Sequence, residues 1–124
     1  MEIATFIKGY FDCALWASTL GDDCGTPMDK DHSLDDLAEC AQEKLRDDAT
    51  EFYLAHETAL LRYCERTQND ADYAGHDFWL TRNGHGAGFW DRGIGELGEH
   101  LSHVARECGS CDLYIGDDGK IYAA

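Results

Sequence analysis

Apolar side chains recur at helical spacing along the first half of the chain. Residues 3–19 carry one such series and are predicted to form a helix, and a second series runs from residue 34 to about residue 66. As a single rod the second helix would be about 50 Å long, so we expect a break near residues 47–50. Ser33 and Asp36 have the spacing of a capping box at its start. The first half is therefore predicted to be mainly helical.

The pattern changes after a polar connector. Residues 76–81 alternate and are rich in aromatic side chains, which predicts a strand, and the Asn83-Gly84 dipeptide that follows is typical of a tight hairpin turn. A return strand is expected near residues 87–90. Residues 94–108 then show a regular apolar stripe, which predicts an amphipathic helix.

The last segment predicts a second hairpin. Residues 112–115 and 120–123 are expected to pair as strands across the glycine-bounded turn at residues 116–119. Two hairpins favour an antiparallel sheet of about four strands, with helices packed on it. The predicted fold class is α+β, in the order α-α-ββ-α-ββ.

Length and composition favour one domain over residues 1–124, with an acidic, mainly helical part at 1–66 and a hairpin-helix-hairpin part at 76–124. No run of 18 apolar residues is present, so no transmembrane helix is expected. The N-terminal residues do not have the pattern of a signal peptide, which predicts a cytoplasmic protein. The six cysteines are then expected to be reduced thiols.

The net charge of −15 restricts which kinds of partner the protein is expected to bind. The densest region, between Asp22 and Glu51, holds eleven acidic residues against three basic ones. Such a field repels nucleic acids and anionic membranes, and it attracts basic protein surfaces. The alternative is that the acid excess only keeps the protein soluble. The candidate partner-binding acidic face comprises Asp35, Asp36, Glu39, Glu43, Asp47, Asp48 and Glu51.

The block from Gly75 to Arg92 is a second candidate site because it combines two Trp, two Phe and two His with four Gly. Such a density of aromatic and polar groups favours either a tightly packed hairpin or a binding site on it. The residues that would form this hairpin site are His76, Asp77, Trp79, Arg82, His85 and Trp90.

Two further groups of residues are candidates for metal binding or redox chemistry. The C-terminal half contains His76, His85, His100 and His103, which could bind zinc or iron if they converged, or could simply form surface hydrogen bonds. Cys108-Gly-Ser-Cys111 ends a predicted helix, where the helix dipole opposes a thiolate. We therefore predict no metal site, no cofactor and no catalytic residue.

Three segments carry a resemblance to a known group of proteins. The chain contains Ala-Leu-Trp-Ala-Ser-Thr at residues 14–19, the long block at residues 74–92, and Asp-Leu-Tyr-Ile-Gly-Asp-Asp-Gly at residues 112–119. In these segments, which comprise 33 of the 124 residues, it resembles a family of small bacteriophage and prophage proteins. The resemblance implies an accessory protein that acts in the cytoplasm of an infected bacterium.

These observations favour binding over catalysis. The leading hypothesis is an inhibitor that imitates DNA and occupies a basic groove of a host nucleic-acid-binding defence protein, such as a CRISPR effector or a restriction enzyme. One alternative is an enzyme or a ligand- or metal-binding domain with its site at residues 75–92. The other is a self-associating structural protein, for example a homodimer with Trp79 or Trp90 between subunits.

Overall fold

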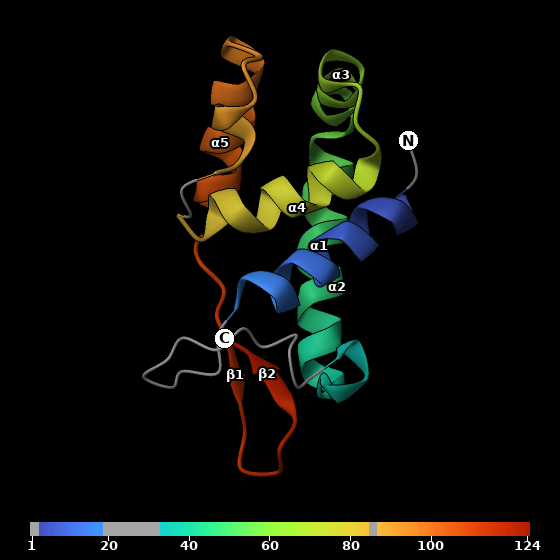
Figure 1. Ribbon diagram of the computed structural model, residues 1–124, viewed down its shortest axis with the longest axis vertical. Helices are drawn as coiled ribbons and strands as arrows, with labels where there is room; N and C mark the ends of the chain where they lie inside the picture. Colours follow the sequence, from blue (N-terminus) through green and yellow to red (C-terminus); the bar gives the residue numbers. More distant parts are fainter. Residues whose placement is uncertain (1–2, 19–32, 85–86) are drawn as a thin grey trace.

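The computed structural model describes residues 3–18, 33–84 and 87–124, and these residues are mostly helical. The four-stranded α+β fold that the sequence predicted is wrong, because the only sheet in the described residues has two strands. The elements, shown in Figure 1, are α1 (Ile3–Ala17), η2 (Leu34–Asp36), α2 (Glu39–Ala55), α3 (Glu57–Thr67), α4 (Ala71–Arg82), η3 (Phe89–Asp91), α5 (Glu96–Glu107), β1 (Leu113–Ile115) and β2 (Ile121–Ala123).

The predicted long helix is broken, although not where the sequence analysis placed the break. Helix α2 ends at Ala55, and α3 begins at Glu57 after His56 leaves helical geometry with φ −127° and ψ 25°. The two helices follow one another along the long axis of the molecule (Figure 1). At the start of this region the amide of Ser33 donates to Asp36 Oδ2 at 2.8 Å, so the predicted interaction caps the short helix η2 rather than α2.

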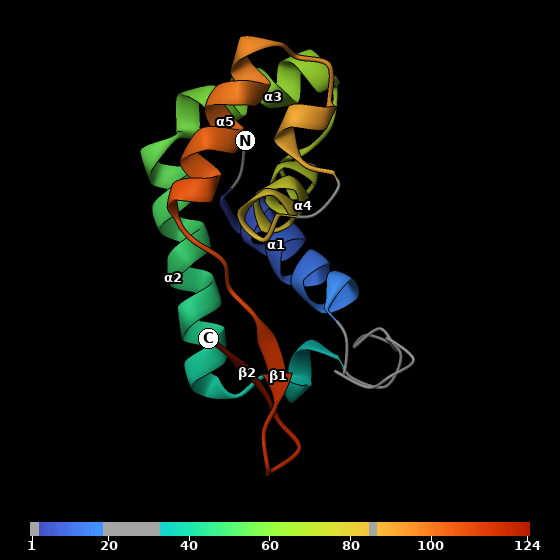
Figure 2. The same cartoon turned by 90° about the vertical axis from the view of Figure 1, so that its left-hand side faces the viewer.

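Helices α1 and α4 cross at two glycines in the middle of the molecule (Figure 2). A methyl group at Gly9 would overlap the backbone of Asp72, and one at Gly75 would overlap the backbone of Phe6. Only glycine therefore permits this close contact between the two backbones. The crossing joins the N-terminal part of the chain to the aromatic block that begins at Gly75.

Helix α4 replaces the predicted strand at residues 76–81. Its buried residues include Ala71, Ala74, Gly75 and Phe78, which repeat at helical spacing. Asn83 ends the helix, and Gly84 follows with φ +70°, a conformation that glycine adopts readily at helix C-termini. The Asn-Gly pair thus terminates a helix, and η3 occupies part of the predicted return strand at residues 87–90.

The core is built largely from stacked aromatic rings. The Phe52 and Phe78 rings lie 4.0 Å apart between centroids and are almost parallel, and Phe6 stacks on both at longer range. The Tyr63 ring meets Phe89 edge-on at 5.4 Å. Buried side chains from residues 6–63 and from residues 71–121 belong to one hydrophobic cluster.

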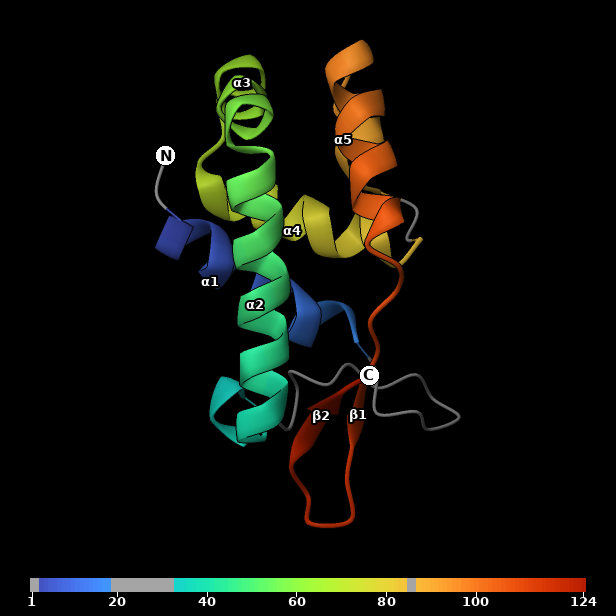
Figure 3. The same ribbon diagram turned by 180° about the vertical axis from the view of Figure 1, so that it is seen from behind.

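The C-terminal hairpin is confirmed. Strands β1 and β2 pair antiparallel, with Leu113 opposite Ala123 and Ile115 opposite Ile121. The amide of Ala38 donates to the carbonyl of Ile121 at 2.8 Å, which attaches the hairpin to the start of α2. Figure 3 shows the hairpin beside the lower end of that helix.

Candidate functional site

The exposed face of α2 carries a row of carboxylates. Four acidic residues at four-residue intervals are exposed, and we call them the α2 acidic stripe: Glu39, Glu43, Asp47 and Glu51. At 1.5 Å per residue the stripe extends over about 18 Å of helix. Asp35, also exposed, and the half-buried Asp36 precede it around η2. Most of the predicted acidic face is therefore accessible to a partner.

Asp48 does not belong to this accessible surface. Its Oδ2 accepts a hydrogen bond from Arg82 Nη1 at 2.9 Å and lies 3.2 Å from Lys44 Nζ. A carboxylate that neutralises a buried guanidinium supports the fold. The interpretation of Asp48 as a partner contact is therefore replaced by a structural role.

Arg82 connects three parts of the fold. Besides its ion pair, its Nη1 donates to Tyr10 Oη at 2.8 Å, and its Nε donates to the carbonyl of Gly109 at 2.8 Å. Its Nη2 donates to the carbonyl of Cys108 at 3.1 Å, at the C-terminal end of α5. Each nitrogen of the buried guanidinium thus has a partner within the protein, and Arg82 is not available to a ligand.

Asp77 is the centre of a second buried network. Its Oδ1 accepts from Arg92 Nη2 at 2.6 Å, and its Oδ2 accepts from Arg92 Nε at 2.9 Å and from the hydroxyl of Tyr63. This bidentate geometry is the strong form of an arginine–carboxylate pair. The carboxylate is fully buried, and burial is the main cause of the raised pKa of Tyr63, followed by the charge of Asp77. Asp77 therefore joins α4 to the segment after η3.

The remaining members of the predicted hairpin site do not converge with these two. Trp79 is buried, and its Nε1 has no hydrogen-bond partner among the described residues. Trp90 is 45 % exposed on η3, and His76 stacks on Tyr73 with ring centroids 6.1 Å apart. His85 lies outside the described residues. What the sequence presents as one site is, in the described part of the chain, largely internal support.

The histidines are also dispersed. His103 pairs with Glu107 at 2.7 Å on the surface of α5, whereas His100 faces His56 across a groove. In residues 3–18, 33–84 and 87–124, no three His, Cys, Asp or Glu side chains are grouped so that they could hold a metal ion. Cys108 is an exposed free thiol and Cys111 a buried one.

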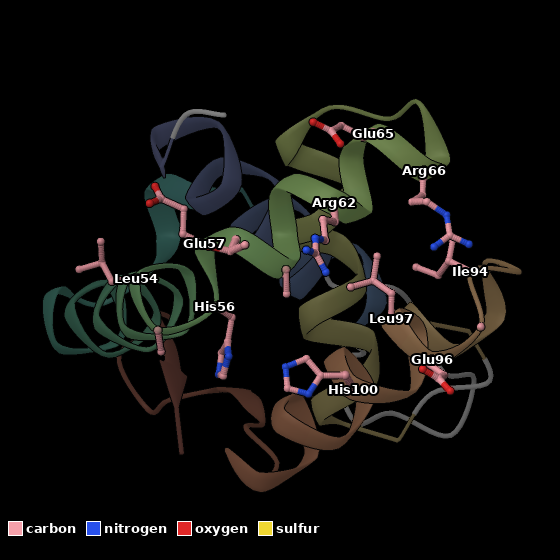
Figure 4. A pocket seen from close by; sticks show the side chains of 14 residues that line it. Leu54, His56, Glu57, Arg62, Glu65, Arg66, Ile94, Glu96, Leu97 and His100 are labelled. Atoms are coloured by element: carbon pink, nitrogen blue, oxygen red, sulfur yellow. The ribbon is translucent and has the colours of Figure 1, made fainter.

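A groove of about 1100 Å³ lies between α3 and α5. Its lining combines apolar side chains from the end of α2, from α3 and from α5 with charged ones. Figure 4 shows Arg62, His56 and His100 directed into the groove, with Glu57 and Glu65 directed away from it. None of the sites predicted from the sequence includes this groove.

A weak signal for the groove is present in the sequence. Arg62 has Thr58 four residues before it and Arg66 four residues after it, so Glu65, three residues after it, is its only acidic neighbour at helical contact spacing. The contribution of α5 could not be read from this signal, because α5 approaches α3 only through the tertiary fold.

Comparison with known proteins found no matching family model, no matching curated protein and no matching solved structure. Within the described residues, no helix is both long enough and apolar enough to cross a membrane.

Proposed function

We propose that this chain is a phage or prophage accessory protein that acts by binding, and that it inhibits a host nucleic-acid-binding defence protein by imitating DNA. A CRISPR effector or a restriction enzyme is the proposed class of target. The observation that carries the proposal is the exposed α2 acidic stripe in a chain with a net charge of −15. The resemblance of residues 14–19, 74–92 and 112–119 to small phage proteins supports the cellular context.

The charge density of the stripe supports imitation of one DNA strand. Over about 18 Å of axis, one strand of B-DNA carries roughly five phosphates and the duplex roughly ten. The stripe presents Glu39, Glu43, Asp47 and Glu51 over that length. A basic groove that tracks one phosphate backbone would therefore meet a similar row of anions.

The helix that carries the stripe is held rigidly, which favours binding because less conformational entropy is lost on association. On its inner face, Leu45, Ala49 and Phe52 are buried in the core. Asp48 fixes the same helix to Arg82, and Ala38 fixes its start to the C-terminal hairpin. The carboxylates are thus presented on a pre-organised surface.

The buried networks argue against the alternative of a ligand site at residues 75–92. The polar groups of Asp77 are already bonded to Tyr63 and Arg92, and Arg82 is already paired with Asp48, so neither side chain is free to hold a ligand. The self-association alternative loses one of its two candidate anchors, because Trp79 is buried within the chain. Trp90 remains exposed, and light scattering of the purified protein tests whether it supports a dimer.

The test is affinity capture from bacterial lysate with this protein as bait, with and without excess double-stranded DNA. We expect capture of a nucleic-acid-binding protein that the DNA displaces. If no captured protein is displaced by DNA, imitation of DNA is wrong.

A further inference from the structure

The groove between α3 and α5 contains two arginines, Arg62 and Arg66, that have no ion-pair partner among the described residues. Arg62 and Arg66 are exposed on α3, and within the described residues neither makes an ion pair or hydrogen bond. By contrast, Arg82 and Arg92 are both neutralised by buried or half-buried carboxylates. An acidic protein that leaves two adjacent arginines unneutralised beside a cavity offers an anion a local binding point.

The surroundings of these arginines are apolar. Ala55, Ala59, Ile94 and Leu97 line the groove, and Leu54 lies at its edge with 65 % of its surface exposed. A groove of about 1100 Å³ is slightly larger than the usual small-molecule site, which occupies about 300–1,000 Å³. Apolar walls with a few convergent polar groups are the usual composition of such sites. The groove therefore suits a molecule with an apolar body and one charged end.

Two imidazoles lie beside the arginine that points into the groove. The rings of His56 and His100 meet edge-on with centroids 6.1 Å apart, and Figure 4 shows both directed toward the space below Arg62. Burial lowers the pKa of His56, and His100 lowers it further, whereas Glu107 acts in the opposite direction. An anion bound here would favour the protonated imidazole and would itself bind more tightly to it.

The acidic residues that line the groove do not prevent an anion from binding beside Arg62. Glu57 and Glu65 are directed away from the groove, and Glu96 lies at its periphery (Figure 4). At these positions their carboxylates lie away from the space into which Arg62 is directed, and solvent screens their charges.

We propose that the groove between α3 and α5 is a binding site for a small amphipathic anion, in which Arg62, assisted by His56 and His100, holds a carboxylate and the apolar walls hold its hydrocarbon part. The site is separate from the α2 acidic stripe and does not depend on the proposed inhibition of a defence protein.

The test compares octanoate with octan-1-ol, which has the same chain length and no charge, by two-dimensional NMR titration of the full chain. The overall charge of −15 opposes an anion, so tighter binding of octanoate requires a local cation. We expect octanoate to bind at least about tenfold more tightly than octanol, with shift changes confined to the groove residues. Octanoate should also raise the pKa of His56.

Substitutions distinguish this site from non-specific association. R62Q should remove most of the preference for octanoate, and R62K should restore part of it. R106Q is the matched control, because Arg106 is exposed on α5 outside the groove and the change in net charge is the same. A55W should block both probes, because Ala55 is an exposed residue of the lining.

Octanoate binding no tighter than octanol, or a preference that survives R62Q, would overturn the proposal. Shift changes centred outside α3 and α5 would also overturn it. Unchanged spectra away from residue 62 will confirm that R62Q is folded, so a loss of binding can be assigned to the missing charge.

Discussion

Two buried acid–base pairs explain why the most unusual block of the sequence is internal. Asp77 binds Arg92 and Tyr63, and Arg82 binds Asp48 and Tyr10. Each pair joins segments far apart in the sequence. A buried charge is tolerated only when its partners are in place, so these residues define how the helices fit together.

The first prediction concerns Asp77. D77N should lower the free energy of unfolding by about 3 kcal/mol, because the half-buried Arg92 loses a fully buried counter-ion. Urea denaturation at neutral pH measures the loss. The control is D12N, which removes an exposed pair with Lys8 and should cost less than about 1 kcal/mol. Equal losses in the two variants would contradict the central role of Asp77.

The second prediction concerns alkaline pH. Burial, reinforced by the charges of Asp77 and Asp12, raises the pKa of the Cys13 thiol from 9.0 to about 12. Above pH 9 the unfolded chain loses this proton while the folded chain keeps it, so stability must fall as pH rises toward 12. Between pH 7.5 and pH 10, Cys13 should account for about 1 kcal/mol of the loss in unfolding free energy.

Urea denaturation of C13A at pH 7.5 and pH 10 checks the contribution of Cys13. Between these pH values the variant should lose less unfolding free energy than the wild type. C40A, which removes an exposed thiol, should keep the wild-type pH dependence. If C13A and C40A behave alike, Cys13 is not the buried group that resists ionisation.

For individual acidic residues of α2, the sequence predicted which side chains are exposed better than it predicted what each side chain does. The stripe residues Glu39, Glu43, Asp47 and Glu51 are exposed as a helical acidic face requires. Asp48 lies among them in sequence, but its role depends on Arg82, 34 residues away. No local pattern identifies such a partner.

At the scale of elements, the fold depends on the crossing of α1 and α4. Gly75→Ala should lower the unfolding free energy by about 2 kcal/mol, because overpacking against the backbone of Phe6 exceeds the gain in helix propensity. Thermal or urea unfolding of the variant and the wild type measures this loss of unfolding free energy. Gly84→Ala, where a methyl group meets open space but φ is +70°, should cost only about 1 kcal/mol. A G75A protein as stable as the wild type would refute the close crossing.

The same elements show where sequence reasoning succeeded and where it failed. The C-terminal hairpin and the amphipathic helix α5 were predicted nearly to their ends, because one face of each is buried and the pattern is regular. Helix α4 was predicted as a strand because it is buried on several sides and its polar residues pair internally. The spacing of Ala71, Ala74, Gly75 and Phe78 carried the helical signal that the aromatic residues obscured.

At the scale of the whole molecule, charge is divided between two surfaces. Among the described residues, the α2 acidic stripe faces solvent without a basic side chain in its own row, and Arg62 and Arg66, which make no ion pair there, lie at the groove between α3 and α5. The first surface suits a basic macromolecule, and the second suits a small anion. Binding at the stripe should weaken with added salt, because the contact is exposed and electrostatic.

The central claim is that the α2 acidic stripe binds a basic nucleic-acid-binding surface, and one comparison of three baits tests it most directly. The baits are the wild type, a variant with E39Q, E43Q, D47N and E51Q, and a control with E57Q, E65Q, E96Q and E99Q. The two variants have the same net charge, and all eight residues are exposed. We predict that the wild type and the control capture the same DNA-displaceable protein from bacterial lysate, and that the stripe variant does not. Equal capture by all three baits, or no DNA-displaceable protein on any of them, would contradict the claim.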